Sequence, residues 1–332
     1  MNCGIIGLPN VGKSSLFNLL TGDNAPSSNY PYCTVEPNLG IARLKDSRME
    51  KLRQIFPGSK VTYPAVEFVD IAGLPPGASK GEGLGNQFLS AIRNVYGIVH
   101  VVRAFKSGNV SRFDSKSSTP LQDLKLVETE LFLSDIEIVQ RRLKEDPDSE
   151  YYNGALKKLE REIPPGPDKE GVLLTPKPQI ILVNISTGGE RPDIKRENVI
   201  YLDVEFQKEL LNMDSRERKE FIDTLPADEA VLENVLEKVK VMLDQVTFFT
   251  VTGGEELKGY NVKRGTTVTT GAGKVHTDME KNFIKARVFN YSDFKKTKFS
   301  LPRLKNKGLI RTVGRDYIVQ DGDILEIMFG KN

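Results

Sequence analysis

The stretch Gly7-Leu8-Pro9-Asn10-Val11-Gly12-Lys13-Ser14 decides the fold of this chain. It follows a short apolar run and precedes residues 15–20, whose apolar side chains recur at helical spacing. Strand, glycine loop and helix in this order predict a phosphate-binding loop, since backbone N–H groups at a helix N-terminus point at phosphate oxygens. Lys13 is expected to reach the β- and γ-phosphates, and the Ser14 hydroxyl to ligate magnesium. The residues predicted to bind a nucleotide here are Asn10, Val11, Gly12, Lys13, Ser14 and Ser15.

A glycine turn that merely precedes a helix is the alternative, and a second element disfavours it. Residues 66–69 predict a buried strand that ends in Asp70-Ile71-Ala72-Gly73. The Asp70 carboxylate would then lie at a strand tip and hold the magnesium through water. Gly73 would offer its backbone N–H to the γ-phosphate, a contact that hydrolysis removes. At this distance after a phosphate-binding loop, the pattern indicates a nucleotide switch.

Length and composition describe an ordinary globular protein. The 332 residues allow two or three domains, with 39% apolar and 28% charged residues. No apolar run approaches the roughly 18 residues of a membrane span, and the N-terminus lacks the basic start of a signal peptide, so a cytoplasmic protein is expected. Two cysteines without metal-ligand spacing, and two histidines, disfavour a zinc site.

The charges are segregated along the chain. Residues 257–315 contain 15 Lys and Arg against 3 Asp and Glu, a local net charge of +12, while the whole chain has +2 and the remainder therefore −10. Such asymmetry favours a surface that faces nucleic acid. A solvated basic surface without a partner is the alternative, and charge alone does not choose between the two.

The first two thirds of the chain predict an α/β doubly wound domain with an insertion. Apolar runs bounded by turn signals predict parallel strands, and residues 85–95 predict a helix between two of them. From residue 121 two helical stripes joined by a turn at 145–148 predict an antiparallel hairpin, which residues 164–167 end. The predicted strands are residues 3–7, 66–70, 98–102 and 179–184.

The last third predicts a smaller α+β domain. An amphipathic helix over residues 228–246 precedes short runs rich in β-branched and aromatic residues, separated by glycine turns. These runs predict strands at 248–251, 286–289, 317–319 and 324–329. The predicted division is a P-loop NTPase domain in two parts, 1–120 and 167–246, an inserted hairpin at 121–166, and a C-terminal domain at 247–332.

Seven segments in this order resemble one known family almost from end to end, the YchF or Obg-like ATPase family of P-loop proteins. That resemblance implies a Ras-like nucleotide domain, an inserted helical hairpin and a C-terminal TGS domain of the β-grasp type. It also implies that Thr34 ligates the magnesium and acts in catalysis with Lys13 and Gly73, that ATP is bound, and that the partner is the ribosome or ribosomal RNA, with no membrane or DNA partner. The segments that carry it are residues 7–14, 30–38, 70–74, 77–86, 100–103, 273–278 and 316–323.

One departure from the GTPase pattern concerns recognition of the nucleotide base. Asn184 and Ile185 stand where GTPases begin their guanine-reading motif, and we expect them to contact the nucleotide. GTPases place an acidic residue three positions after that Asn, because a carboxylate accepts from both guanine N1–H and N2–H. Here the position is Thr187, and the nearest acid is Glu190. A hydroxyl cannot accept both bonds, so the sequence predicts a preference for ATP over GTP.

Two further departures concern hydrolysis. Leu74 replaces the glutamine that orients the attacking water in Ras-type enzymes, so unassisted hydrolysis should be slow. In related switch proteins the residue at Asn10 supports a potassium ion, which makes potassium a candidate helper. Arg112 occupies the place of a histidine that the family uses. It either neutralises γ-phosphate charge or is a solvated loop residue.

Two functions of different classes follow. The first is a slow ATPase switch whose ATP-ordered surface is read by the ribosome. The second is an RNA-binding or ribosome-binding regulatory module in which ATP or GTP is only a ligand and hydrolysis is incidental. A small-molecule kinase is disfavoured, because the glycine-rich segment after Asp70 is typical of a switch.

Overall fold

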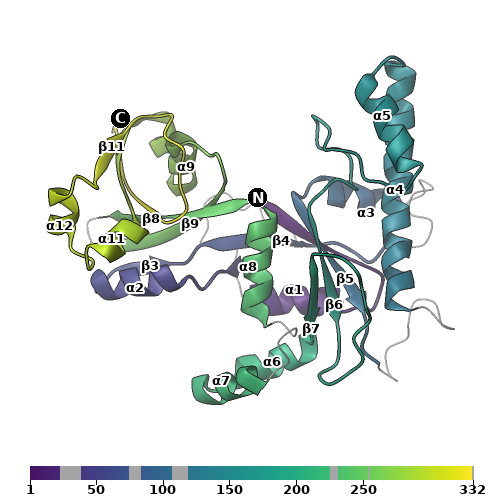
Figure 1. Ribbon diagram of the computed structural model, residues 1–332, viewed down its shortest axis with the longest axis horizontal. Coiled ribbons are helices and arrows are strands. Elements are labelled where there is room, and N and C mark those ends of the chain that lie inside the picture. The colour runs from purple at the N-terminus through teal and green to yellow at the C-terminus, as the bar shows by residue number, and fades with distance from the viewer. Residues whose placement is uncertain (23–38, 75–83, 107–118, 225–230, 253–254, 331–332) are drawn as a thin grey trace.

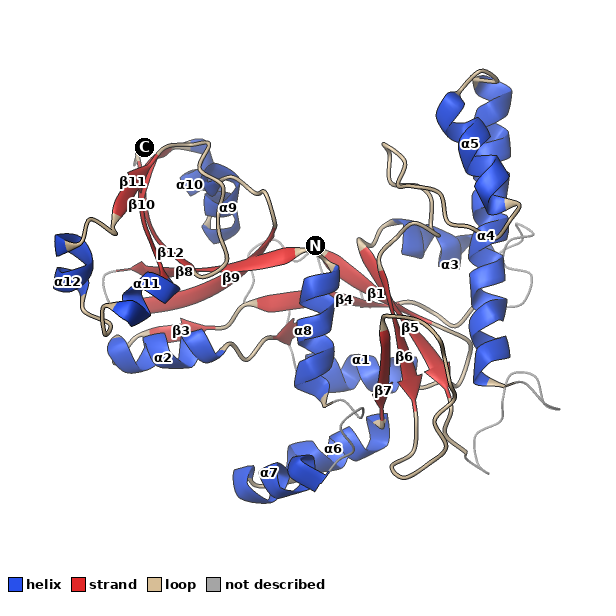
Figure 2. Ribbon diagram, in the orientation of Figure 1, coloured by secondary structure: helices blue, strands red, loops and turns tan. Residues whose placement is uncertain are grey.

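The computed structural model describes residues 1–22, 39–74, 84–106, 119–224, 231–252 and 255–330. These residues form two six-stranded sheets, which are the centres of two lobes (Figures 1 and 2). The helix α8 (Leu232–Met242) lies between the lobes, and β8 (Gln245–Thr252) of the second sheet follows it in the chain.

The first sheet has the order β2-β4-β1-β5-β6-β7 and is parallel except at one edge, where β2 runs antiparallel to β4. This confirms the predicted doubly wound domain and the Ras-like arrangement that the family resemblance implies. The central strand β5 is buried at every position, because helices cover both faces of a parallel sheet. The strands are β1 (Asn2–Ile6), β2 (Leu39–Arg43), β4 (Ala65–Asp70), β5 (Gly97–Arg103), β6 (Gln179–Asn184) and β7 (Val199–Leu202).

Helices pack on this sheet through apolar faces. In α1, Leu16, Leu19 and Leu20 are buried in the main core, and in α8 the same core receives Val235 and Val239. In both helices the buried apolar residues recur at spacings of three and four positions, which places them on the one face that covers the sheet. Besides α8, the helices of this lobe are α1 (Lys13–Thr21), α3 (Leu84–Arg93), α6 (Val204–Asn212) and α7 (Ser215–Thr224).

The inserted hairpin consists of α4 (Pro120–Glu145) and α5 (Glu150–Leu159), and it extends away from the sheet in Figure 1. The first helix begins at residue 120 because Thr119 and Gln122 form a capping box and proline suits the first helical position. Ile138, Val139 and Ala155 form a small core between the two helices. The predicted antiparallel hairpin is thus confirmed.

The second sheet has the order β11-β10-β12-β8-β9-β3. Its first C-terminal strand, β8, lies parallel to its last, β12, which is the central pair of a β-grasp fold. Its strands are β3 (Lys60–Thr62), β8 (Gln245–Thr252), β9 (Glu256–Lys263), β10 (Phe283–Asn290), β11 (Arg311–Val313) and β12 (Asp323–Phe329). Its helices are α9 (Val268–Val275), α10 (Thr277–Lys281), α11 (Tyr291–Lys296) and α12 (Leu301–Asn306).

An early segment of the chain belongs to the C-terminal lobe, which the predicted division does not foresee. Helix α2 (Ser47–Ile55) and strand β3 come early in the chain, yet β3 pairs with β9 and Met49 and Leu52 are buried in the core of the C-terminal domain. Arg48 joins this segment to the C-terminal domain by an ion pair with Asp321 at 2.6 Å. Residues 47–62 therefore complete the second sheet rather than the first, because their apolar face finds its partners there.

Two expected elements differ in the structure. Residues 317–319 form no strand but a single bridge between Ile318 and Thr267, and their backbone pairs with residues 266–268, which belong to no strand. The helix expected over 228–246 ends at Met242, and Gln245 already belongs to β8. Five strands were not predicted: β2, β3, β7, β9 and β11. Of these, β3, β7 and β11 are only three or four residues long, and β9 is interrupted by charged residues and a glycine.

Candidate nucleotide site

The phosphate-binding loop connects β1 to α1 and has the backbone that such a loop needs. Gly12 has φ 101° and directly precedes the helix, and a Cβ added to it would lie 2.5 Å from Asn184 Nδ2. Only glycine fits this position. Asn10 also has a positive φ, 63°, which asparagine tolerates better than most residues, and its side chain is exposed.

Lys13 lies inside the loop rather than in solvent. It is only 7% exposed, and its Nζ donates a hydrogen bond to the Leu8 carbonyl oxygen at 2.8 Å. Burial lowers the pKa of this ammonium to about 8, and the nearby Asp70 carboxylate opposes that change. The charge thus has a neutral carbonyl as its hydrogen-bond acceptor, where a phosphate oxygen would be a stronger one.

Ser14 and Asp70 meet at the edge of the sheet. Ser14 Oγ donates to Asp70 Oδ2 at 2.9 Å, although 56 positions separate them in the chain. The other carboxylate oxygen, Oδ1, is buried and has no hydrogen-bond partner among the described residues. Two adjacent oxygen ligands, one of them unsatisfied, fit a magnesium ion, which prefers oxygen. Thr34, the third predicted ligand, lies outside the described residues.

The segment after Asp70 returns to the loop. A Cβ added to Gly73 would lie 3.1 Å from Lys13 Nζ, so this glycine lies directly beside the ammonium. The N–H of Leu74 donates to the Gly7 carbonyl oxygen at 3.1 Å, and the Leu74 side chain is buried in the core with 1% exposed. The residue in the place of the catalytic glutamine therefore offers no group to a water molecule.

Asn184 supports the loop, which sequence reasoning did not foresee. Its Nδ2 donates to the Val11 carbonyl oxygen at 3.0 Å, and its Oδ1 accepts from the N–H of Val204 at 3.2 Å. It thus joins the loop, the end of β6 and the start of α6. The Ile185 side chain, expected at the nucleotide, is buried in a neighbouring core, so that any contact from this residue comes from its backbone.

Two further residues lie near the candidate site and were not expected there. Asp203 accepts hydrogen bonds from the Thr187 N–H and hydroxyl while capping α6 through Phe206, and an Asp before a helical run is the signal that could have located it. His100 lies in β5 beside the loop strand. Burial, with a smaller effect of the Lys13 charge, lowers the pKa of His100 to about 3, so the imidazole is neutral.

Comparison with known proteins identifies the relatives of this chain. A family model described as 50S ribosome-binding GTPase matches residues 2–133, and the model YchF-GTPase_C, described as a protein of unknown function, matches residues 245–330. A ribosome-binding ATPase YchF from Buchnera aphidicola is 36% identical over 98% of both chains, and one from Bacillus subtilis is 34% identical over 99% of both. The chain belongs to the YchF family.

Solved structures agree with this membership. The YchF GTPase of Schizosaccharomyces pombe superposes with a TM-score of 0.79 at 27% identity, over 99% of this chain and 97% of that one. A GTP binding protein from Pyrococcus horikoshii shares the fold, with a TM-score of 0.59 at 18% identity. YchF relatives are thus named as ATPases in some cases and as GTPases in others. Among the described residues, no helix has the length and apolarity to cross a membrane.

Proposed function

We propose that this YchF protein is a magnesium-dependent ATPase switch that acts on the ribosome, and hence in the cytoplasm. The observation that carries the proposal is the convergence of Lys13, Ser14, Asp70 and Gly73 at one edge of a Ras-like sheet. The names of its relatives, ribosome-binding ATPases, support the partner and the nucleotide. Ribosomal RNA is the proposed contact of the basic C-terminal surface.

Each residue has a role that follows from its position. The loop N–H groups hold the α- and β-phosphates, and Lys13 leaves the Leu8 carbonyl to bind the β- and γ-phosphates. Ser14 and Asp70 would hold magnesium, with Thr34 as the further ligand that family membership suggests. The ion would neutralise developing charge on the phosphates. Gly73, beside Lys13, would sense the γ-phosphate through its N–H.

We expect this protein to bind ATP more tightly than GTP. At the position of the guanine-reading acid, Thr187 donates its hydroxyl to Asp203 at 2.9 Å, so the neighbouring carboxylate already has hydrogen bonds from Thr187 and from the start of α6. Glu190 is 92% exposed and lies 3.8 Å from Lys106. Neither acid is placed as the paired acceptor for guanine. The measurement is calorimetric titration with each magnesium-nucleotide.

A tenfold or greater preference for GTP, about 1.4 kcal/mol, would contradict this expectation. It would mean that Asp203 or Glu190 changes partners when nucleotide binds. Titration of Glu190→Gln distinguishes the two, because Glu190 is exposed and its replacement should not disturb the fold. If GTP preference persists in that variant, Asp203 is the acid responsible.

Hydrolysis should be slow, and faster in potassium than in sodium. The reasons are the buried Leu74, which cannot orient water, and Asn10, whose exposed side chain on the loop is our proposed support for the potassium ion. Asn10→Gly is the informative variant, since glycine accepts the left-handed backbone and removes only the side chain. Equal turnover of the wild type in the two salts would remove the potassium proposal and leave the switch proposal intact.

The second candidate is a ribosome-binding module in which the nucleotide is a ligand and hydrolysis is incidental. The buried Leu74 favours it over a fast enzyme, because no group at this position can position water. Turnover measured with and without ribosomes separates the two functions. Stimulation by ribosomes supports the switch, whereas ribosome binding that responds to ATP without stimulated turnover supports the module.

A further inference from the structure

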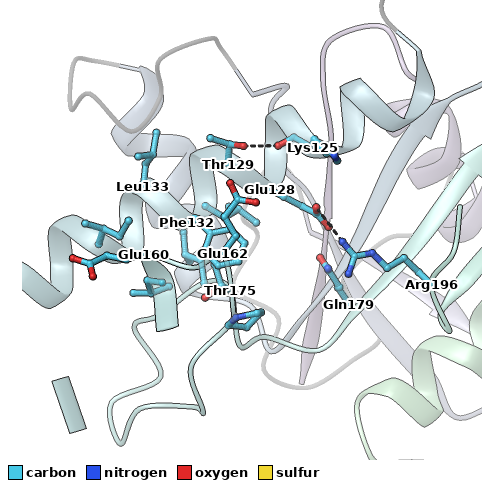
Figure 3. Close-up of a pocket in the computed structure, with 15 residues that line it drawn as sticks. Lys125, Glu128, Thr129, Phe132, Leu133, Glu160, Glu162, Thr175, Gln179 and Arg196 are labelled. Carbon is cyan, nitrogen blue, oxygen red and sulfur yellow. Dashed lines mark hydrogen bonds and ion pairs between the residues drawn. The ribbon is translucent and has the colours of Figure 1, made fainter. Parts of the chain in front are cut away.

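The base of the inserted hairpin contains a pocket of about 440 Å³ that none of the nucleotide-site residues line. It is enclosed by α4, the end of α5 and the chain that returns to the sheet (Figure 3). The volume falls in the range of about 300 to 1,000 Å³ that is typical of ligand sites. Its apolar lining residues include Leu131, Phe132, Ile136, Leu159 and Leu174.

Acidic side chains also line this pocket, next to its apolar residues. The Glu128 side chain is 17% exposed, and its carboxylate lies 3.6 Å from Arg196 (Figure 3). Burial raises the pKa of Glu128, the charges of Arg196 and Lys125 oppose that rise, and the negative charge of Glu162 adds to it. Within the described part of the chain, the Glu162 carboxylate has no hydrogen bond or ion pair of its own. The pocket is lined by three acids, Glu128, Glu160 and Glu162, and by two bases, Lys125 and Arg196, so its lining has a net charge of −1.

The backbone of Glu162 is in an unfavourable conformation. Its φ is 56°, and it ends α5 with the Glu162 N–H on the Leu159 carbonyl and the Ile163 N–H on the Lys158 carbonyl, each at 2.9 Å. This helix-ending turn favours glycine or asparagine at the left-handed position. A glutamate there sacrifices stability, and strain of this kind is often found where a side chain is needed for function.

The charge of the hairpin indicates the kind of partner. Residues 121–166 contain 11 Asp and Glu against 7 Lys and Arg, a net charge of −4, opposite in sign to the +12 of residues 257–315. A negative surface repels nucleic acid phosphates and attracts basic polypeptide segments. We propose that this pocket docks a lysine or arginine side chain from a basic segment of a partner protein.

In this complex the aliphatic stem of the basic side chain lies on Phe132 and Leu159, and its charged head meets Glu162 beside Glu128. Long basic side chains commonly bury their stem and keep the charge with a partner. The inference goes beyond the proposed function, because the nucleotide site and the basic surface lie elsewhere in the molecule and neither is needed for it.

The test measures the binding of a short fluorescein-labelled peptide of arginine and leucine to the full chain by fluorescence anisotropy. Glu162→Gln and Glu162→Gly should each weaken binding about fivefold, equivalent to about 1 kcal/mol. Glu162→Gly should also unfold at a higher temperature than the wild type, because glycine relieves the backbone strain. Lower affinity together with higher stability is a result that a purely structural Glu162 would not produce.

The matched control is Asp148→Asn, which removes one negative charge from the exposed turn at the far end of the same hairpin. It should leave peptide affinity nearly unchanged. The proposal is overturned if wild-type protein does not bind the peptide, if Glu162→Gly binds it as the wild type does, or if Asp148→Asn weakens it equally. Equal binding of a glutamate-leucine peptide or of an RNA hairpin, with the same dependence on Glu162, would also overturn it.

Discussion

Replacement of Lys13 by alanine is expected to weaken ATP binding at least about 100-fold, or about 2.7 kcal/mol. The ammonium is 7% exposed and lies beside Gly73, so it meets the triphosphate away from bulk water. A hydrogen bond to a charged group in such a place contributes about 1.5 to 3 kcal/mol, and the variant leaves phosphate charge without its partner. Calorimetric titration with magnesium-ATP measures the decrease in affinity.

Ser14→Ala extends this test to the metal. Removing the Ser14 hydroxyl, which lies 2.9 Å from Asp70, should lower ATP affinity in magnesium but hardly change it in a chelator, where the wild type should fall to the same level. Lys45→Ala is the control, because Lys45 is exposed and forms an ion pair with Glu233 at 3.2 Å. Wild-type affinity in Lys13→Ala would refute the nucleotide site.

Neutralising six basic residues on the C-terminal domain is expected to weaken ribosome binding at least about 100-fold at low salt. Helices α11 and α12 lie next to each other at the end of the molecule farthest from the inserted hairpin (Figure 1). All six side chains are exposed, and no acidic residue occurs between positions 294 and 315. The six are Lys295, Lys296, Lys298, Arg303, Lys305 and Lys307.

Salt dependence is the sharper measurement of the same interaction. For every phosphate that the variant no longer neutralises, the slope of log affinity against log salt should become shallower by roughly 0.7 to 0.9. Lys296 already pairs with Asp293 at 3.0 Å and should contribute less than the others. Sedimentation with ribosomes at several salt concentrations gives the slope, and ATP affinity should not change because the nucleotide site is in the other domain.

A control for positive charge removed elsewhere is a variant with three exposed residues of the inserted hairpin, Lys157, Lys158 and Arg161, replaced by glutamine. It should bind ribosomes nearly as the wild type does. If the six substitutions leave sedimentation and its salt slope unchanged, the basic surface is only solvated. The inserted hairpin would then be the better candidate for the ribosome contact.

Much of the fold could be predicted because its signals are local. The four central strands of the first sheet and the hairpin at 120–159 lie where apolar periodicity places them, since a buried strand or an amphipathic helix needs its pattern within its own few residues. The C-terminal domain was predicted less completely. Residues 317–319 have the composition of a strand but make a single bridge, because the neighbouring backbone needed for a strand is not there.

The placement of α2 and β3 could not be read from the sequence. Met49 and Leu52 have the spacing of any amphipathic helix, and nothing local states which of two sheets they cover. Which sheet they cover depends on apolar residues and an unpaired strand edge of the C-terminal domain, roughly two hundred positions later in the chain. Neither element was predicted, and residues 1–120 were assigned to the NTPase domain as one block, whereas the structure pairs β3 with β9.

Sequence by itself determined the chemistry that depends on residue type at short spacing. The glycines and Lys13 of the phosphate loop, the carboxylate at Asp70 and the missing acid after Asn184 can each be read within a few positions. Only the tertiary structure decided which distant groups meet. Asn184 donates a hydrogen bond to the phosphate-binding loop, 173 positions away in the chain, and Glu162 lines the same pocket as Glu128. Such contacts depend on how separate elements pack against each other, and local periodicity carries no record of that packing.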